Sequence, residues 1–203
     1  MAEIDLYVDP VCPFAWVTAR WLLRTAGAEH AVTVKQMSLA VLNEGQSVDD
    51  AHAPMLTRSR RFGRLFAAAR EHHGDTAFGA LYAAVGARLH TAAARPDDVD
   101  VAAALYEAGL DPELVRALDD PAFDPAVTRA HEASQAVLGG RGGSPLLAVD
   151  GRGFSGPVFT EPPAADRAAA VLDAMLTLAT EPAFAALQRP YQGPPSFTPG
   201  EKR

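Results

Sequence analysis

The amino-acid sequence predicts a mixed α/β fold in which a block of helices separates two halves of one small sheet. Three observations predict it. Two β-rich runs near the start flank a helical pattern, helical spacing then fills the middle of the chain, and two more β-rich runs follow, separated by Asp150-Gly151. A strand–helix–strand order predicts parallel strands with a right-handed crossover. Asp-Gly between apolar runs predicts an antiparallel hairpin.

The first unit is expected to be β-α-β. Residues 4–8, "IDLYV", are β-rich and are followed by an Asp-Pro pair, which is typical of the end of a strand. From Pro13 to about Ala26 the apolar residues follow helical spacing, and Gly27 is a stop signal. Residues 31–37, "AVTVKQM", predict the second strand.

The middle of the chain, from about residue 56 to 138, is expected to be helical. Apolar side chains recur there at intervals of three and four residues. Gly109 and Gly139 stand where two of these helices are expected to end. The expected helices cover residues 56–72, 78–89, 95–109, 111–118 and 121–138.

The last part of the chain is expected to return to the sheet. Residues 146–149 and 154–155 predict the two strands of the hairpin. A helix is expected from about Pro163 to Thr180, and a short helix over residues 182–188. The tail, residues 189–203, is rich in proline and glycine and is expected to be extended or disordered.

The order of these elements predicts the fold. Two parallel strands come first, a helical block follows, and an antiparallel hairpin with a final helix comes last. This β-α-β … β-β-α order is that of a thioredoxin-like fold with a helical insertion. We therefore expect residues 1–50 and 140–188 to form the thioredoxin-like domain and residues 51–139 to form the insertion.

The composition favours a globular protein whose partners are small molecules or proteins. Hydrophobic residues make up 48% and charged residues 21% of the chain. The net charge of −7 argues against a nucleic-acid partner, because phosphate contacts need a positive field. No apolar run approaches the roughly 20 residues that cross a bilayer, and the acidic start lacks the regions of a signal peptide. We therefore expect a cytoplasmic protein without a membrane partner, and the excess of Ala, Arg, Gly and Pro suggests a high-GC bacterial source.

Cys12 is the only cysteine and stands between the first expected strand and helix. One cysteine cannot form an internal disulfide, which fits a reducing compartment. A thiol at a helix N-terminus faces free backbone N–H groups and the positive end of the helix dipole, which favour the thiolate. We therefore expect Cys12 to be partly exposed, with a pKa below the free value of about 8.5. The alternative is that Cys12 is a small buried apolar residue.

Two motifs carry a resemblance to a known family. "DPVCPFAW", residues 9–16, resembles the active-site turn of the DsbA-type thioredoxin-like oxidoreductases, and "GGSPLL", residues 142–147, stands where those enzymes have their cis-proline loop. More narrowly, the chain resembles the actinobacterial mycothiol-dependent nitroreductase group. The matching segments fall in order along nearly the whole chain, and they are "DPVCPFAWVTARWLL", "MSLAVLNE", "ARLH", "SPLLAVDG" and "GPV".

This resemblance implies thiol chemistry that uses a low-molecular-weight thiol, by resemblance mycothiol, as co-substrate and no tightly bound cofactor. The other substrate would be a small molecule or a mixed disulfide. One departure matters: the family's redox pattern is Cys-x-x-Cys, whereas Ala15 stands at the fourth position here. A single thiol cannot resolve its own mixed disulfide, so an external thiol must attack the sulfur bound to Cys12. The alternative is that Ala15 marks a lost activity.

The resemblance also implies which residues bind the substrate. Pro13 suits the first turn of a helix, where its missing N–H is no loss, and Phe14 is expected at the mouth of the site, able to stack on a flat ligand. The Ser144-Pro145 bond is expected to be cis, against the usual preference of such bonds. That geometry would turn the backbone of Ser144 toward a ligand on Cys12. The alternative for Pro145 is an ordinary proline at the start of a strand.

Asn43 and His90 complete the expected site. Asn43 follows the second strand, where a polar residue can orient a substrate; the alternative is a turn or cap residue. His90 ends an expected helix, and the resemblance implies an acid role or a ligand contact; the alternative is that it complements the helix dipole. The sequence has no evident cluster of convergent metal ligands and no flavin or nicotinamide motif.

These observations predict that Cys12 is the nucleophile of a monothiol thiol-disulfide oxidoreductase. Two other classes of protein stay open at this point. A kappa-type glutathione transferase or isomerase would have the same architecture but would activate a bound thiol without forming a disulfide. A non-catalytic thioredoxin-like module would only bind its partner. A mixed disulfide trapped on Cys12 separates the oxidoreductase from both.

Overall fold

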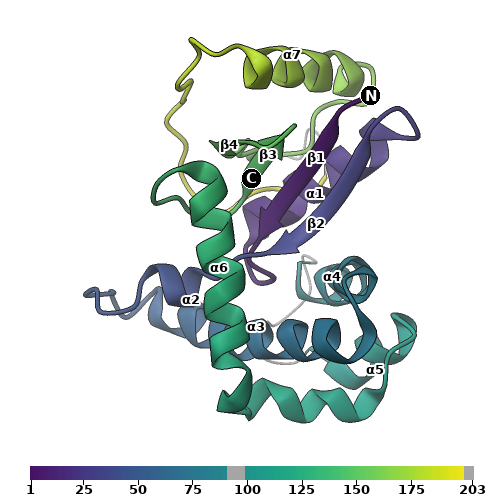
Figure 1. Ribbon diagram of the computed structural model, residues 1–203, viewed down its shortest axis with the longest axis vertical. Coiled ribbons are helices and arrows are strands. Elements are labelled where there is room, and N and C mark those ends of the chain that lie inside the picture. The colour runs from purple at the N-terminus through teal and green to yellow at the C-terminus, as the bar shows by residue number, and fades with distance from the viewer. Residues whose placement is uncertain (91–98, 199–203) are drawn as a thin grey trace.

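The computed structural model describes residues 1–90 and 99–198 (Figure 1). Its four strands form one sheet in the order β2-β1-β3-β4. The central pair, β1 and β3, joins the N-terminal part of the chain to the C-terminal part. The strands are β1 Glu3–Val8, β2 Ala31–Gln36, β3 Leu146–Val149 and β4 Arg152–Ser155.

The pairing of the strands confirms the predicted topology. β1 and β2 run parallel with Leu6 opposite Val34, and β3 pairs antiparallel with both β1 and β4. The turn between β3 and β4 has positive φ at Asp150 (47°) and at Gly151 (81°). Positive φ at both central residues is what a tight two-residue hairpin requires, and Asp-Gly supplies it. The fold is thioredoxin-like, as the order of elements predicted.

The two faces of the sheet are covered by different helices. Ile4 and Leu6 of β1 point into the main core, which they share with α1 (Pro13–Ala26). Tyr7, on the opposite face, belongs to a smaller apolar cluster that packs against α6 (Asp124–Leu138). In Figure 1 α1 lies behind β1 and β2, and α6 runs beside the ends of these strands, where it contacts β2, β3 and β4. The alternation of side chains along β1 thus places the strand between two layers of helix.

The helices between β2 and β3 pack largely on one another, beside one end of the sheet (Figure 1). The longest of them, α3, contacts α2, α4 and α6 and so forms the centre of this block. The 3-10 helices are marked η. The elements are α2 Leu39–Leu42, α3 Ala53–His73, α4 Thr76–Leu89, α5 Val101–Glu107, η2 Pro112–Asp119, η3 Pro121–Phe123 and α6. The division of the chain into a thioredoxin-like domain and an insertion stays a prediction.

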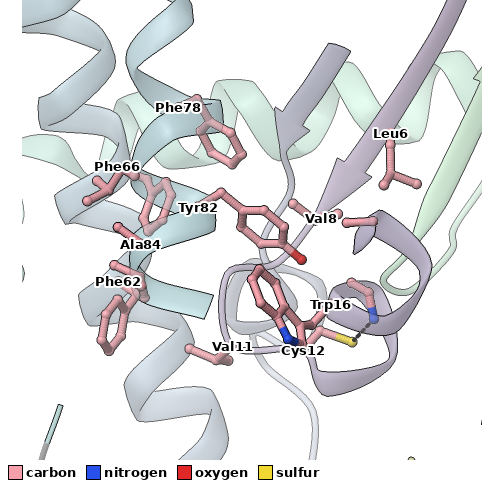
Figure 2. Close-up of a cluster of buried hydrophobic side chains, with 14 of the residues drawn as sticks. Leu6, Val8, Val11, Cys12, Trp16, Phe62, Phe66, Phe78, Tyr82 and Ala84 are labelled. Atoms are coloured by element: carbon pink, nitrogen blue, oxygen red, sulfur yellow. Dashed lines mark hydrogen bonds between the residues drawn. The ribbon is translucent and has the colours of Figure 1, made fainter. Parts of the chain in front are cut away.

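Buried aromatic side chains join the helical block to α1 (Figure 2). The ring of Trp16 lies 5.6 Å from that of Tyr82 in α4, and Phe66 of α3 lies 4.9 Å from Phe78. Gly86 makes the close approach of α4 to α1 feasible, because a Cβ atom there would lie 2.2 Å from the Trp16 ring. Trp16 follows the single cysteine by one turn of helix, so this contact sets the position of α4 beside the thiol.

The helical expectations are corrected at three places. Residues 111–118 form a 3-10 helix rather than an α-helix. Helix α7, Ala168–Thr180, begins later than the expected Pro163 and packs against α1. Residues 182–188 form no helix. A segment of that length, next to prolines at both ends, makes too few helical hydrogen bonds to offset the cost of helix nucleation.

Two further expectations concern residues at the edges of the described chain. The expected helix 95–109 corresponds to α5, and its residues 95–98 lie outside the described residues. In the expected tail, residues 189–198 have no regular secondary structure, and residues 199–203 lie outside the description. Among the helices that are described, none is both long enough and apolar enough to cross a membrane.

Candidate active site

Cys12 lies at the junction of β1 and α1 and is the N-cap residue of α1. Its Sγ accepts a hydrogen bond from the backbone N–H of Ala15 at 3.5 Å, shown as a dashed line in Figure 2. The same thiol donates to the carbonyl oxygen of Ser144 at 3.3 Å. The sequence predicted this position at the helix N-terminus, because a strand ends and Pro13 begins the helix there.

The thiol is buried, which corrects two expectations. Cys12 is only 5% exposed, whereas we expected it to be partly exposed. Burial raises the pKa of the thiol from an ordinary value of 9.0 to about 11, although hydrogen bonds with Ala15 and Ser144 act in the opposite direction. The expected lowering of the pKa considered only the helix N-terminus, and the loss of water around the thiolate outweighs it. In this arrangement the thiol is neutral at pH 7.

The loop before β3 forms the second side of the site. The Ser144-Pro145 peptide bond is cis. The Ser144 hydroxyl accepts a hydrogen bond from the backbone N–H of Asp9 at 2.9 Å, and the Pro145 carbonyl accepts one from Gly156 at 2.9 Å. Ser144 therefore contacts the turn between β1 and α1 through both its side chain and its carbonyl group, and it lies directly against Cys12.

Asp9 is a functional candidate that the sequence reasoning missed. Its carboxylate is fully buried and accepts hydrogen bonds from the backbone N–H of Val11 (2.9 Å), the backbone N–H of Leu39 (2.6 Å) and the Ser59 hydroxyl (2.5 Å). Burial raises the pKa of Asp9, against the effect of these hydrogen bonds. The sequence does carry a signal, because Asp9 directly follows a buried strand and stands three residues before Cys12.

His90 lies on the helical side of the site. It is 7% exposed, its Nε2 lies 3.4 Å from the carbonyl oxygen of Pro10, and its ring lies 5.8 Å from Trp16. Burial lowers its pKa from 6.5 to about 4, so the imidazole is neutral at pH 7. A neutral imidazole can still donate or accept a hydrogen bond, which leaves a ligand contact as its expected role and removes that of a charged acid.

The other residues expected in the site are Pro13, Phe14 and Asn43. Pro13 is the first residue of α1, and Phe14 is half-buried, with its ring 5.1 Å from that of Tyr191. Asn43 is the C-cap residue of α2, and its side-chain amide donates to the Leu39 carbonyl at 2.8 Å. That bond directs the amide to its own helix, as the cap interpretation of Asn43 predicts.

A buried hydroxyl also lies near the thiol. Tyr82 is 2% exposed, and its hydroxyl has no hydrogen-bond partner among the described residues. Burial, with smaller contributions from Cys12 and Asp9, raises the pKa of Tyr82 well above 10. Within residues 1–90 and 99–198 there is no group of three or more His, Cys, Asp or Glu side chains that could hold a metal ion.

Comparison with known structures shows the fold of the chain. It is similar to the crystal structure of a probable DsbA oxidoreductase, SCO1869, from Streptomyces coelicolor, with a TM-score of 0.57 and 24% identity over 96% of this chain and 97% of that one. It is also similar to the structure of a 2-hydroxychromene-2-carboxylate isomerase, with a TM-score of 0.55 and 18% identity over 87% of this chain and 95% of that one. At these identities the likeness concerns the thioredoxin-like fold alone.

Comparison of sequences shows the family. The chain is 32% identical over 196 residues, which are 94% of this chain and 83% of the relative, to the uncharacterized protein Rv2286c of Mycobacterium tuberculosis. A family model described as "Rv2466c-like: Mycothiol-dependent nitroreductase Rv2466c" matches residues 11–189. The match includes Cys12, Asn43, His90 and the Ser144-Pro145 loop. Fold and family together indicate a thiol-related oxidoreductase, and the chain belongs to the Rv2466c-like family.

Proposed function

We propose that this protein is a monothiol oxidoreductase that exchanges disulfides with a low-molecular-weight thiol, mycothiol, through Cys12. One observation carries the proposal: the only thiol of the chain caps helix α1 and lies 3.3 Å from the carbonyl group of Ser144. A nucleophile at a helix N-terminus, beside the backbone of the Ser144-Pro145 loop, is suited to a disulfide that must be held and attacked in line. The absence of a second cysteine from the sequence makes an external thiol necessary.

The proposed reaction has two exchange steps. The Cys12 thiolate attacks one sulfur of a disulfide RS–SR′, so that a Cys12–SR bond forms, the RS–SR′ bond breaks and R′S⁻ leaves and takes up a proton. A small-molecule thiolate then attacks the sulfur of R, which releases a new disulfide and regenerates the Cys12 thiolate. The N–H of Ala15 already donates to Sγ and would stabilise the negative charge in both steps.

The neighbouring residues receive proposed roles in the same reaction. Ser144 and Pro145 would shape the groove for the substrate, Pro13 and Phe14 its mouth, and neutral His90 would contact the ligand. Asn43 would orient the substrate from the end of α2, where its amide donates to the Leu39 carbonyl. We propose that the protein acts in the cytoplasm, where a single thiol is kept reduced.

The test is a covalent adduct on Cys12. Protein incubated with the mycothiol disulfide should gain the mass of one mycothiol, the adduct should map to Cys12, and added mycothiol should remove it. Cys12→Ser should give no adduct and no mycothiol-dependent disulfide reduction. An adduct-free wild-type protein, or a Cys12→Ser variant with full activity, would rule the proposal out.

A second candidate function is favoured by the neutral state of the buried thiol. A thiol with a pKa of about 11 donates a hydrogen bond at pH 7 and can bind a substrate thiol without attacking it. This is the behaviour expected of a kappa-type transferase or isomerase. Such a protein would bind a small thiol and turn over without ever forming a Cys12 mixed disulfide, and a non-catalytic module would bind without turnover.

A further inference from the structure

The C-terminal segment that follows α7 returns to the apolar core around the candidate site. Phe184 packs near Phe154 of β4, with the ring centres 6.4 Å apart, and the chain then continues without helix or strand. Pro195 is buried, and Phe197 packs against the apolar core that contains Cys12.

This segment has ring contacts with two residues of the candidate site, Phe14 and His90. The ring of Tyr191 is 5.1 Å from Phe14, two residues after Cys12. The ring of Phe197 is 6.0 Å from His90, whose Nε2 contacts the carbonyl group of Pro10, two residues before Cys12.

Between the two aromatic contacts, the segment is tied to the chain that follows β4. The backbone N–H of Ser196 donates to the carbonyl oxygen of Thr160 at 2.7 Å. The loop containing Thr160 lies along α1, since the hydroxyl of Thr18 in α1 donates to the carbonyl oxygen of Pro157 at 2.9 Å. Residues 191–197 therefore connect the contact at Phe14 with the contact at His90, and both of these residues lie close to Cys12 in the site.

This arrangement conflicts with the chemistry of the site unless the segment moves. A thiol that is 5% exposed leaves no room for a disulfide or a small-molecule thiol to reach its sulfur. We propose that residues 191–198 form an inhibitory strap that is closed over Cys12 at rest and competes with the substrate for the groove. The proposal rests on the proposed function only for the identity of that substrate.

The strap can move away from Cys12 while the rest of the protein stays folded. It belongs to no helix or strand, and Tyr191 remains 47% exposed even when closed. Segments of this kind open locally at a small fraction of the cost of global unfolding. Opening would also hydrate Cys12, and the removal of burial, the main cause of its high pKa, would favour the thiolate. Opening and activation of the nucleophile would thus be one event.

The first test measures the access of iodoacetamide to Cys12 in the full-length chain. In the double variant Tyr191→Ala, Phe197→Ala, the rate of Cys12 alkylation at fixed pH should rise on the order of tenfold, because two aromatic contacts that hold the strap are lost. Phe184→Ala is the matched control, since it removes an aromatic contact of the same C-terminal segment away from the thiol. Its alkylation rate should stay near that of the wild type.

Two results of this test would overturn the proposal of an inhibitory strap. One is an unchanged alkylation rate in a double variant that circular dichroism shows to be folded. The other is an equal acceleration in all variants, including Phe184→Ala, because the thiol would then react through general unfolding.

The second test uses the wild-type chain. It modifies Cys12 first and then measures whether the strap opens. If the strap and a group on Cys12 exclude each other, carbamidomethylation of Cys12 must open the strap by the same linkage. Hydrogen exchange should then accelerate in a peptide that contains Ser196, whose amide is bonded in the closed state. Unchanged protection there would overturn the proposal. Both tests use iodoacetamide, so the strap can stand even where mycothiol forms no adduct, and the two proposals fail separately.

Discussion

The Sγ atom of Cys12 lies 3.3 Å from the carbonyl oxygen of Ser144, and the two residues are 132 positions apart in the sequence. This contact joins the turn between β1 and α1 to the loop that begins β3. It gives the buried thiol a hydrogen-bond acceptor, so the neutral Cys12 side chain is satisfied on one side by Ser144 and on the other by the N–H of Ala15. The thiol is therefore held in one orientation before any substrate binds.

The raised pKa of Cys12 predicts a specific dependence of stability on pH. The folded protein holds the thiol proton more tightly than the unfolded chain does. The stability that the protonated thiol contributes is therefore complete below pH 9 and is lost as pH rises toward 11. Between these values the wild type should lose roughly 2–3 kcal/mol of unfolding free energy relative to Cys12→Ala. Urea unfolding at a series of pH values measures the difference. Parallel pH profiles of the two proteins would contradict it.

A second thiol at position 15 should change how the proposed mixed disulfide on Cys12 is resolved. Ala15 follows Cys12 by three residues, and its N–H already lies 3.5 Å from Sγ. We expect Ala15→Cys to form a disulfide with Cys12, because residues three apart in the first turn of a helix share a face. The proposed turnover should then depend less on a second molecule of small thiol. Mass spectrometry of the oxidised variant checks the bond.

Ala15→Ser is the matched control for that variant. Ala15 is completely buried, and serine tests the added bulk without adding a thiol. The serine variant should keep the thiol dependence of the wild type. If Ala15→Cys retained two free thiols after oxidation, the expected geometry would be wrong.

Asp9 should contribute to stability by accepting hydrogen bonds from three donors. Asp9→Ala would leave Val11 N–H, Leu39 N–H and the Ser59 hydroxyl without this acceptor in a buried place. We expect a loss of about 2–4 kcal/mol in the free energy of unfolding. Asp166→Ala, at an exposed position, should change it by less than about 0.5 kcal/mol. Denaturant titration of both variants measures the two free energies of unfolding. An equal loss in both would contradict the stabilising role of the buried Asp9.

The contact between α4 and α1 should tolerate no side chain at Gly86. A Cβ atom there would lie 2.2 Å from the Trp16 ring, so Gly86→Ala should destabilise the protein by about 1–3 kcal/mol. Gly79 is in the same helix and has no atom within 4 Å of an added Cβ. Gly79→Ala should therefore stabilise by about 0.5–1 kcal/mol, because alanine favours helix. Melting temperatures that shift in the same direction for both variants would refute the packing argument.

Much of the fold and the position of the thiol could be predicted from the sequence, because they depend on neighbouring residues. The period of apolar side chains indicates the β-α-β start, and Asp150-Gly151 specifies the hairpin. Cys12 followed by Pro13 marks the N-terminus of a helix, and the structure has the thiol there. The family motifs around Cys12 and Pro145 are local as well, and they identified the family that the sequence comparison shows.

The tertiary structure alone decided the environment of that thiol. Burial of Cys12, the Asp9 hydrogen bonds to Leu39 and Ser59, and the return of Phe197 to the site all join residues that are far apart in the chain. A pattern in the sequence reports the helix dipole at Cys12 but not the atoms that exclude water from it. The pKa of a thiol depends on both, and here the removal of water outweighs the helix N-terminus, because a charge loses more from desolvation than it gains from a partial dipole.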